Sequence, residues 1–251
     1  MTRSILFKAW IAVVLLGQMA VLTSAQEPPT YRVLKTDQPV EVDGRLDEEV
    51  WKQVPSVGPF RINQNGTPSD LPTEAWMVYD DEFIYFAFRL EDENIWATYR
   101  QRDQHLWTQE VVEVFIHPNP EHPAYIELEV NPLGTMLDIF LLDIRKPLPY
   151  ESWNSKHLKW AVRVDGTVDG TANDRGWTCE IALPFEDVAM APNVPPAPGD
   201  RWRVNLYRVE NRPEKVGLAW SPTLRPDFHV PSMFGTIEFS GEPASQSEQS
   251  K

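Results

Sequence analysis

The chain has a single cysteine, Cys179, among its 251 residues. One thiol cannot form a disulfide within the chain, so we expect Cys179 to be a buried and inert side chain. The sequence also lacks the GxGxxG, GxxxxGK[ST], HExxH and GxSxG motifs. Their absence removes the local signatures of dinucleotide-binding and P-loop proteins, zinc proteases and α/β-hydrolases.

Basic residues are scarce as well. The chain carries 23 Lys and Arg against 37 Asp and Glu, a formal net charge of −14. A surface with this balance repels phosphate groups. The composition therefore argues against nucleic acid and against anionic membranes as partners.

Long apolar runs are absent except at the start of the chain, where one extends from Ala9 to Leu22. Arg3 and Lys8 precede it, and the small residues Thr23-Ser24-Ala25 follow it, which is the pattern of a secretory signal peptide. The run is shorter than the roughly 20 apolar residues of a membrane span. We expect residues 1–25 to be removed, leaving 21 basic residues against 37 acidic ones. The mature protein is then periplasmic or extracellular.

What remains is dominated by residues that alternate with period two, the pattern of strands with one buried face. The expected strands are Thr73–Tyr79, Phe83–Glu91, Val111–His117, Tyr125–Asn131, Met136–Leu142, Leu158–Val164, Trp177–Leu183, Trp202–Glu210 and Thr236–Phe239. Helical signals are confined to Asp47–Gln53, with Asp47 as a cap, and Pro184–Val188. The fold class is therefore all-β, an antiparallel β-sandwich of the jelly-roll or immunoglobulin type with one or two short helices.

The domain boundaries follow from composition. Residues 26–37 form an N-terminal segment, and residues 38–240 contain every expected strand in one domain. The tail 241–251, GEPASQSEQSK, has almost no apolar side chains and is expected to be disordered.

Alternation also separates two faces of the expected sheet. In the strand that contains Glu113, the neighbours Val112 and Val114 point to the core, whereas Glu113 points to the other side. The same second face receives Glu127, Glu129, Asn131, Asn205 and Tyr207. It is either an ordinary solvated face or the polar floor of a sugar site, with Trp107 and Phe228 as aromatic walls. Arg208 falls on the core side and is expected to be buried beside an acid, for which Glu180 is one candidate.

Seven segments, in this order, resemble carbohydrate-binding modules of family 9 and their relatives in the DOMON-like superfamily of β-sandwiches. They are VEVDGRLDEEVW (40–51), TEAWMVYDDEFIYFAFRLED (73–92), LWTQEVVEVFIHP (106–118), YIELEVNPLGT (125–135), GWTCEIALP (176–184), WRVNLYRVE (202–210) and AWSPTLRPDFHVPSMFG (219–235). The resemblance implies a non-catalytic domain that holds the end of an oligo- or polysaccharide between two aromatic side chains.

The resemblance also implies roles for individual residues. Trp107 falls on the first aromatic wall and Glu113 on a carboxylate that binds sugar hydroxyls. Asn205 matches an asparagine of the family. Phe228 stands where the second wall is a tryptophan, Tyr207 where glutamine is frequent, and Glu129 where an arginine contacts sugar in the xylanase-linked members. These departures leave the identity of the sugar open. Asn131 is expected to complete the ligand contacts because it lies on the same face.

No cofactor is required for such binding, although family relatives bind calcium structurally. The acidic loops offer oxygen ligands of the kind that calcium prefers, with Asp92 and Asp103 as the first candidates.

Three other functions remain open. Glu113 with Glu127 or Glu129 could form the carboxylate pair of a glycosidase. Haem could bind as in some DOMON relatives, through Met77, Met136 or Met233 together with a histidine. The domain could also be a surface or assembly module whose sugar site is no longer functional. The oligomeric state is not determined by the sequence.

Overall fold

The computed structural model describes residues 27–149, 152–171, 173–211 and 213–245. The expected signal peptide 1–25 and the end of the expected tail, residues 246–251, lie outside the described residues. In the part that is described, no helix combines the length and apolar character needed to cross a bilayer. The strands are β1 (Thr30–Lys35), β2 (Arg61–Ile62), β3 (Thr73–Tyr79), β4 (Phe83–Glu91), β5 (Val111–His117), β6 (Tyr125–Val130), β7 (Met136–Leu141), β8 (Lys159–Asp165), β9 (Gly176–Pro184), β10 (Arg201–Glu210), β11 (Val216–Ala219) and β12 (Gly235–Pro243).

All nine expected strands are present, with ends that differ by one residue or less except in β12. That strand runs on to Pro243, and Ala244 is buried, so the ordered chain passes the expected boundary at 240. Three strands, β1, β2 and β11, are not predicted by the alternating pattern. Two of these have only two and four residues, too few to show a period, and β1 lies in a segment where no strand was expected.

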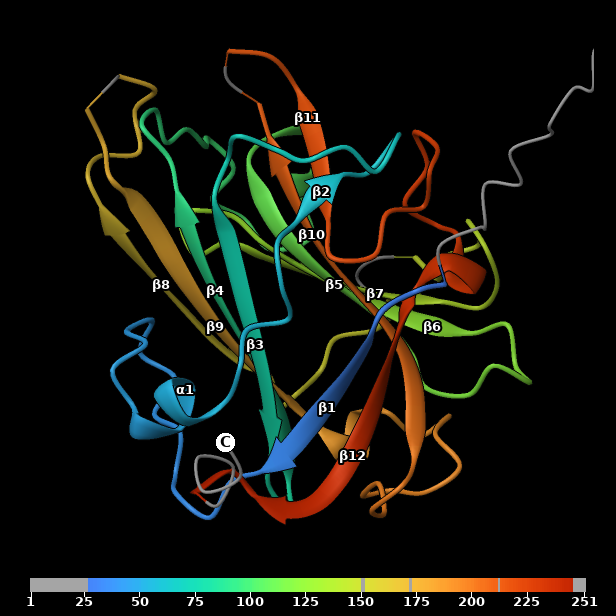
Figure 1. Ribbon diagram of the computed structural model, residues 1–251. Coiled ribbons are helices and arrows are strands. Elements are labelled where there is room, and N and C mark those ends of the chain that lie inside the picture. Colours follow the sequence, from blue (N-terminus) through green and yellow to red (C-terminus); the bar gives the residue numbers. More distant parts are fainter. Residues whose placement is uncertain (1–26, 150–151, 172, 212, 246–251) are drawn as a thin grey trace, which may run out of the picture.

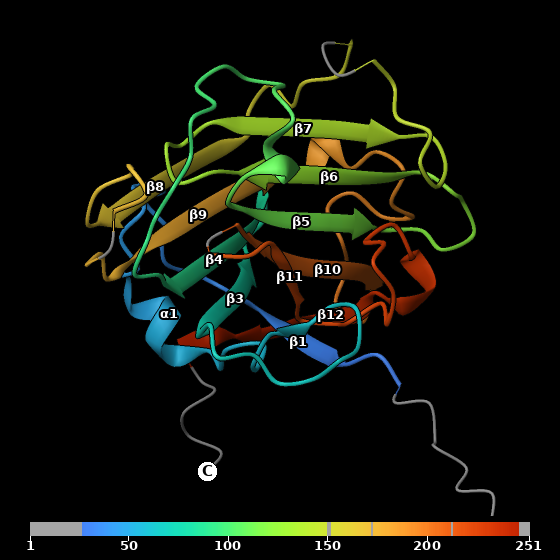
Figure 2. The same cartoon turned by 90° about the horizontal axis from the view of Figure 1, so that it is seen from above.

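The strands form one continuous sheet that curls into a sandwich, as Figures 1 and 2 show. Its hydrogen-bonded order is β7-β6-β5-β10-β12-β1-β3-β4-β9-β8, with β11 and β2 attached beside β10. The predicted sandwich is confirmed with one difference, because β1 pairs in parallel with both β12 and β3. β1 and β12 thereby join the layer of β5, β6, β7 and β10 to the layer of β3, β4, β8 and β9.

The main core lies between these two layers. Side chains from alternate positions of both layers meet there, among them Met77, Phe86, Val114, Cys179 and Leu206, all fully buried. Cys179 is confirmed as a buried free thiol. Met77 and Met136, two of the methionines considered for haem, also belong to this core.

A short helix, α1 (Glu49–Gln53), covers the outer face of β3, β4 and β9. The carboxylate of Glu180 accepts hydrogen bonds there from Trp51 Nε1 (3.0 Å) and from the N–H groups of Asp43 (3.1 Å) and Gly44 (2.9 Å). Glu180 therefore anchors the helix and the turn before it, and the suggestion that it pairs with Arg208 was wrong. The helix begins later than expected, and Glu48 occupies the cap position in place of Asp47, without a side-chain cap.

The Gly44 turn gives the first testable prediction. Gly44 has φ +84°, and a Cβ at this position would lie 2.8 Å from the backbone carbonyl carbon of Val162. Gly44→Ala combines a strained dihedral with a backbone clash, and we expect it to lower the free energy of unfolding by about 2 kcal/mol or more. Gly134→Ala is the matched control, because Gly134 has φ +74° and no neighbour within 4 Å. Urea denaturation measures both, and equal losses in the two variants would contradict the close approach at Gly44.

Candidate functional site

The outer face of β5, β6, β7 and β10 is the second face that the sequence separates from the core. It is not an open, solvated face. The 3₁₀ turn Leu106–Thr108 and the segment 228–234 lie over it and bury a second apolar cluster. A cavity of about 520 Å³ remains between cover and sheet. Its lining residues are Trp107, Glu113, Phe115, Glu127, Ile139, Leu141, Arg145, Pro147, Val209, Lys215, Gly217, Pro226, Asp227, Phe228 and His229.

Two half-buried aromatic rings line this cavity, each supported by another ring. Trp107 stacks on His105 with ring centroids 4.5 Å apart. Phe228 stacks on Tyr207 at 4.2 Å with the planes only 4° apart. The Phe228 ring also lies over Gly217, where a Cβ would come within 2.6 Å of it. Because one face of each ring is already covered, at most the other face can contact a ligand.

The polar floor of the cavity consists of glutamates from neighbouring strands. Glu113 on β5 stands directly opposite Glu129 on β6, and Glu127 lies two residues before Glu129. All three are buried, and one carboxylate oxygen from each lies within 4.8 Å of the other two. Glu113 and Glu127 line the cavity, and the fully buried Glu129 lies next to them.

Burial changes the acidity of this floor triad, Glu113, Glu127 and Glu129. Removal from water, more than any other effect, raises the pKa of Glu127 to about 7. The same cause, followed by repulsion from Glu127, raises the pKa of Glu113 well above its ordinary value. The pKa of Glu129 is likewise raised well above its ordinary range, by burial first and then by the charges of Glu113 and Glu127. Three adjacent carboxyl groups in an apolar setting therefore share protons near neutral pH.

The rim of the cavity carries charged groups that sequence reasoning did not select. Arg145 forms an ion pair with Asp227, with Nη2 2.7 Å from Oδ1. Lys215 Nζ donates a hydrogen bond to the Trp107 carbonyl at 2.8 Å. These residues lie in loops, Lys215 just before the short strand β11, outside any alternating pattern, so no sequence signal placed them beside the glutamates.

The remaining predicted ligand residues lie beneath the cavity wall. Tyr207 is fully buried and donates a hydrogen bond from its hydroxyl to the Phe228 carbonyl at 2.9 Å. Asn205 donates to the Tyr207 hydroxyl and to the Ser221 carbonyl, both at 2.7 Å. Both side chains support Phe228 from below and do not line the cavity.

Asn131 is placed differently again. Its side-chain oxygen accepts from the N–H groups of Leu133 and Thr135, and its amide donates to the Tyr99 carbonyl. It closes the turn after β6 and holds the loop that precedes Trp107. Of the seven predicted ligand residues, the structure thus brings Trp107, Glu113 and Phe228 to the cavity surface.

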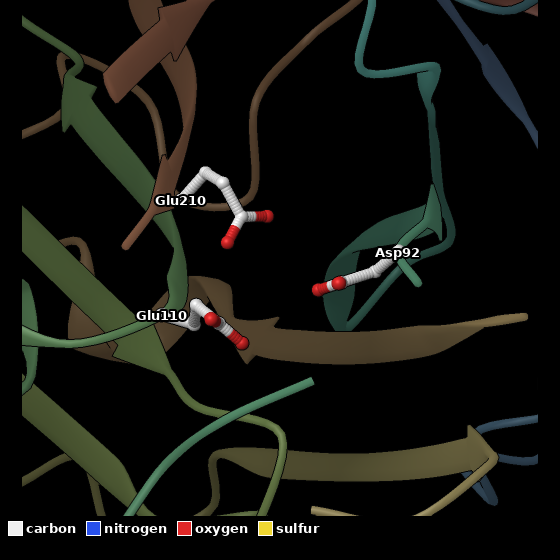
Figure 3. A group of neighbouring side chains, drawn as sticks. All are labelled: Asp92, Glu110 and Glu210. Atoms are coloured by element: carbon white, nitrogen blue, oxygen red, sulfur yellow. The ribbon is translucent and has the colours of Figure 1, made fainter. Parts of the chain in front are cut away.

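A second group of buried carboxylates lies where β4 and β10 end and β5 begins. Asp92 follows β4, Glu110 precedes β5 and Glu210 ends β10, and the three point toward a common space in Figure 3. Arg208 lies beside them, 2.7 Å from Glu210 and 3.6 Å from Asp92. The expectation of a buried arginine paired with an acid is confirmed, with these two partners.

This end cluster, Asp92, Glu110 and Glu210, has more negative charge than Arg208 balances. Asp92 Oδ2 and Glu110 Oε1 are buried and accept no hydrogen bond. Burial, and then the charge of Glu210, raise the pKa of Glu110 to about 9. Asp103, the other predicted calcium ligand, is not a member of this cluster. Its backbone N–H donates to Met136, and its carboxylate lies 4.0 Å from Arg102.

The buried glutamates predict that stability falls as pH rises. For Glu127 and Glu110 the folded-state pKa, about 7 and about 9, lies above the ordinary 4.5. The folded chain then holds protons that the unfolded chain has released, so its stabilisation is complete below pH 4.5 and is lost as pH rises through these values. We expect the free energy of unfolding, measured with urea in the presence of a chelator, to be lower at pH 8 than at pH 5 by more than about 1 kcal/mol.

Two variants locate the origin of this dependence. Glu129→Gln should reduce the loss between pH 5 and pH 8, because it removes one of the three groups that must ionise together. Glu121→Gln, at an exposed loop position, is the matched control and should leave the profile as it is in the wild type. A profile that is flat, or that rises with pH, would show that the floor triad is ionised in the folded chain.

Comparison with solved structures finds chains of the same fold. A candidate carbohydrate-binding protein from Bacteroides uniformis ATCC 8492 superposes with a TM-score of 0.70 at 18% identity, over 85% of this chain and 100% of that one. A family 9 carbohydrate-binding module from Caldicellulosiruptor kristjanssonii, in complex with cellotriose, gives 0.59 at 13% identity over 84% and 95% of the two chains. The glucose complex of a family 9 module from the same organism gives 0.58 at 13% identity, over 85% and 96%. The comparison with curated proteins gives no match.

The sequence itself carries the family assignment. Residues 68–239 match the profile of carbohydrate-binding family 9. The matched range begins just before β3 and ends within β12, so it includes both layers of the sandwich and every residue that lines the cavity. The chain belongs to carbohydrate-binding family 9.

Proposed function

We propose that this protein is an exported, non-catalytic binding protein that holds a saccharide in the cavity between Trp107 and Phe228. The observation that carries the proposal is the combination of two supported aromatic rings with a carboxylate floor in one cavity. Its volume of about 520 Å³ lies in the range of small-molecule sites. Export rests on the signal-like segment 1–25.

The chemistry of the lining suits a sugar ring. The C–H faces of a pyranose are apolar and can stack on the ring of Trp107 or Phe228, a contact worth on the order of 1 kcal/mol beyond buried area. Hydroxyl groups can donate to Glu113 and Glu127, whose carboxylates accept hydrogen bonds when ionised. Affinity for one short sugar is expected to be modest, because each hydrogen bond replaces one to water.

The arrangement of the carboxylates favours binding over hydrolysis. A glycosidase pair flanks the scissile bond from two sides. Glu113 and Glu127 instead project from adjacent strands of one sheet face, so both approach a ligand from the same side. The carboxyl groups of this floor can contact hydroxyls together, but they are poorly placed to protonate a leaving group while attacking from the opposite face.

The proposal predicts the behaviour of wall variants. Trp107→Ala with Phe228→Ala should abolish binding across a panel of oligosaccharides in titration calorimetry, because both rings contribute stacking area. Trp153→Ala is the control, since Trp153 packs on Phe140 and does not line the cavity. Binding that survives the double substitution, or is lost equally in the control, would contradict the cavity as the sugar site. Release of reducing sugar by the wild type but not by Glu113→Gln would overturn the non-catalytic part.

A structural calcium ion in the end cluster is the second part of the proposal. When the three carboxylates and the guanidinium of Arg208 are all ionised, the cluster has a net charge of −2. One divalent cation balances this charge. Asp92 Oδ2 and Glu110 Oε1, which accept no hydrogen bond, are available as ligands, and hard cations favour clustered carboxylates. The ion would join the ends of β4, β5 and β10, a stabilising role outside the sugar cavity.

Calcium should therefore raise the melting temperature of the wild type by about 5 °C when present at about 100 times its dissociation constant. Glu110→Gln should remove this rise, because it removes an unpaired ligand oxygen and one charge. Asp103→Asn should retain it, since Asp103 lies outside the cluster. Scanning fluorimetry with calcium and with EDTA measures the shifts. A rise that depends on Asp103 and not on Glu110 would place the ion elsewhere.

A further inference from the structure

Within the described residues, the floor triad has no cation in direct contact. The charge of Lys215 lowers the pKa of Glu113, but by less than burial and the charge of Glu127 raise it. In the end cluster, Arg208 bonds to Glu210. Among the residues that the structure describes, no ion pair within 4.0 Å joins a Lys, Arg or His to Glu113, Glu127 or Glu129. The two cations at the cavity rim are already engaged, Arg145 with Asp227 and Lys215 with the Trp107 carbonyl.

Glu113 also has one carboxylate oxygen without a hydrogen-bond partner. Its side chain is 1% exposed, its Oε1 accepts no hydrogen bond, and the residue lines the cavity. A buried acceptor without a partner costs about 1–3 kcal/mol, and more when it is charged. A ligand that supplies both a donor and a positive charge removes this cost, whereas a neutral hydroxyl supplies only the donor.

The spacing of the triad fits an ammonium group. One oxygen from each glutamate lies within 4.8 Å of the other two. Because 4.8 Å is the largest separation among these three oxygens, a point exists that lies within about 2.8 Å of all of them, in reach of charged N–H···O hydrogen bonds. An ammonium has three N–H donors, one for each carboxylate.

From this geometry we infer that the saccharide bound in the cavity is an amino sugar with a free, protonated amine, and that Glu113, Glu127 and Glu129 hold its ammonium group. The inference rests on the proposed function, since the ring of the same sugar occupies the space between Trp107 and Phe228. The expected ligand is then an unacetylated hexosamine, or an oligosaccharide that ends in one. Acetylation of the amine removes its charge and two of its three N–H donors, and a uronic acid would bring a further carboxylate to the three glutamates of the floor.

The rest of the lining favours an ammonium over a bare divalent ion. The apolar side chains of Phe115, Ile139 and Leu141 line the cavity beside the glutamates. Calcium requires six to eight oxygen ligands, which this apolar wall does not provide. An ammonium attached to a sugar ring needs only the three carboxylates, and its ring carbons suit the apolar wall.

The test is titration calorimetry on the purified protein at pH 7 with EDTA, using glucosamine, galactosamine and mannosamine beside their neutral parent hexoses and N-acetylglucosamine. We expect at least one hexosamine to bind at least tenfold more tightly than its parent hexose and than N-acetylglucosamine. Glu113→Gln and Glu129→Gln should each reduce this preference for the amine to less than threefold. Glu121→Gln, at the exposed loop position, should retain it in full. Melting temperatures report whether each variant is folded.

The outcomes separate this inference from the function on which it rests. If hexoses bind and no hexosamine is preferred, the inference is wrong and saccharide binding stands. If the preference persists in both glutamine variants, the ammonium lies elsewhere and the inference is also wrong. Hexose binding that requires added calcium and is lost in Glu113→Gln would assign the triad to a metal ion. If no sugar or amino sugar binds, the proposed function fails as well.

Discussion

The register of β5 between β6 and β10 determines both the main core and the glutamate floor of the cavity. Val112 and Val114 point into the core between the layers, and the same pairing places Glu113 beside Glu129 on one side and Tyr207 on the other. A shift by one residue would reverse every side chain, moving the glutamate into the main core and the valines to the cavity. The apolar core thus fixes the register, and the register assembles the floor triad.

The two outer faces of the sandwich are covered in different ways, and the difference produces the site. On the layer of β3, β4 and β9, helix α1 packs on the sheet. Glu180 accepts three hydrogen bonds from the helix and from the turn that precedes it. On the other layer, short turns and the segment 228–234 form the cover. This cover packs on the sheet through Leu106 and Phe234, and a cavity lined by Trp107 and Phe228 remains beside them. The position of Phe228 depends in turn on Tyr207 beneath it and on the missing side chain of Gly217.

Three groups of buried carboxylates illustrate different solutions to the cost of burial. Glu180 accepts three hydrogen bonds from its own chain. The end cluster is partly neutralised by Arg208. The floor triad has too few hydrogen-bond donors and no contact ion pair, and the raised pKa values of its glutamates mean that burial favours their protonated forms. Burial without a partner reduces stability unless a ligand supplies what is missing, so the triad is where function is to be sought.

The sequence by itself determined the strands that alternate, the sandwich that they form and the separation of Glu113, Glu127 and Glu129 from the core, because a period of two is a local property of the chain. It also placed Trp107 and Phe228 near the carboxylates, through the family resemblance. Only the tertiary structure decided that Asn205 and Tyr207 lie beneath the wall, that Asp92 joins Glu110 and Glu210 and not Asp103, and that Arg145 and Lys215 reach the rim. These placements depend on how loops cross the sheet and on contacts between residues far apart in the chain. No local pattern encodes such contacts, since they arise only when the two layers and their covers pack together.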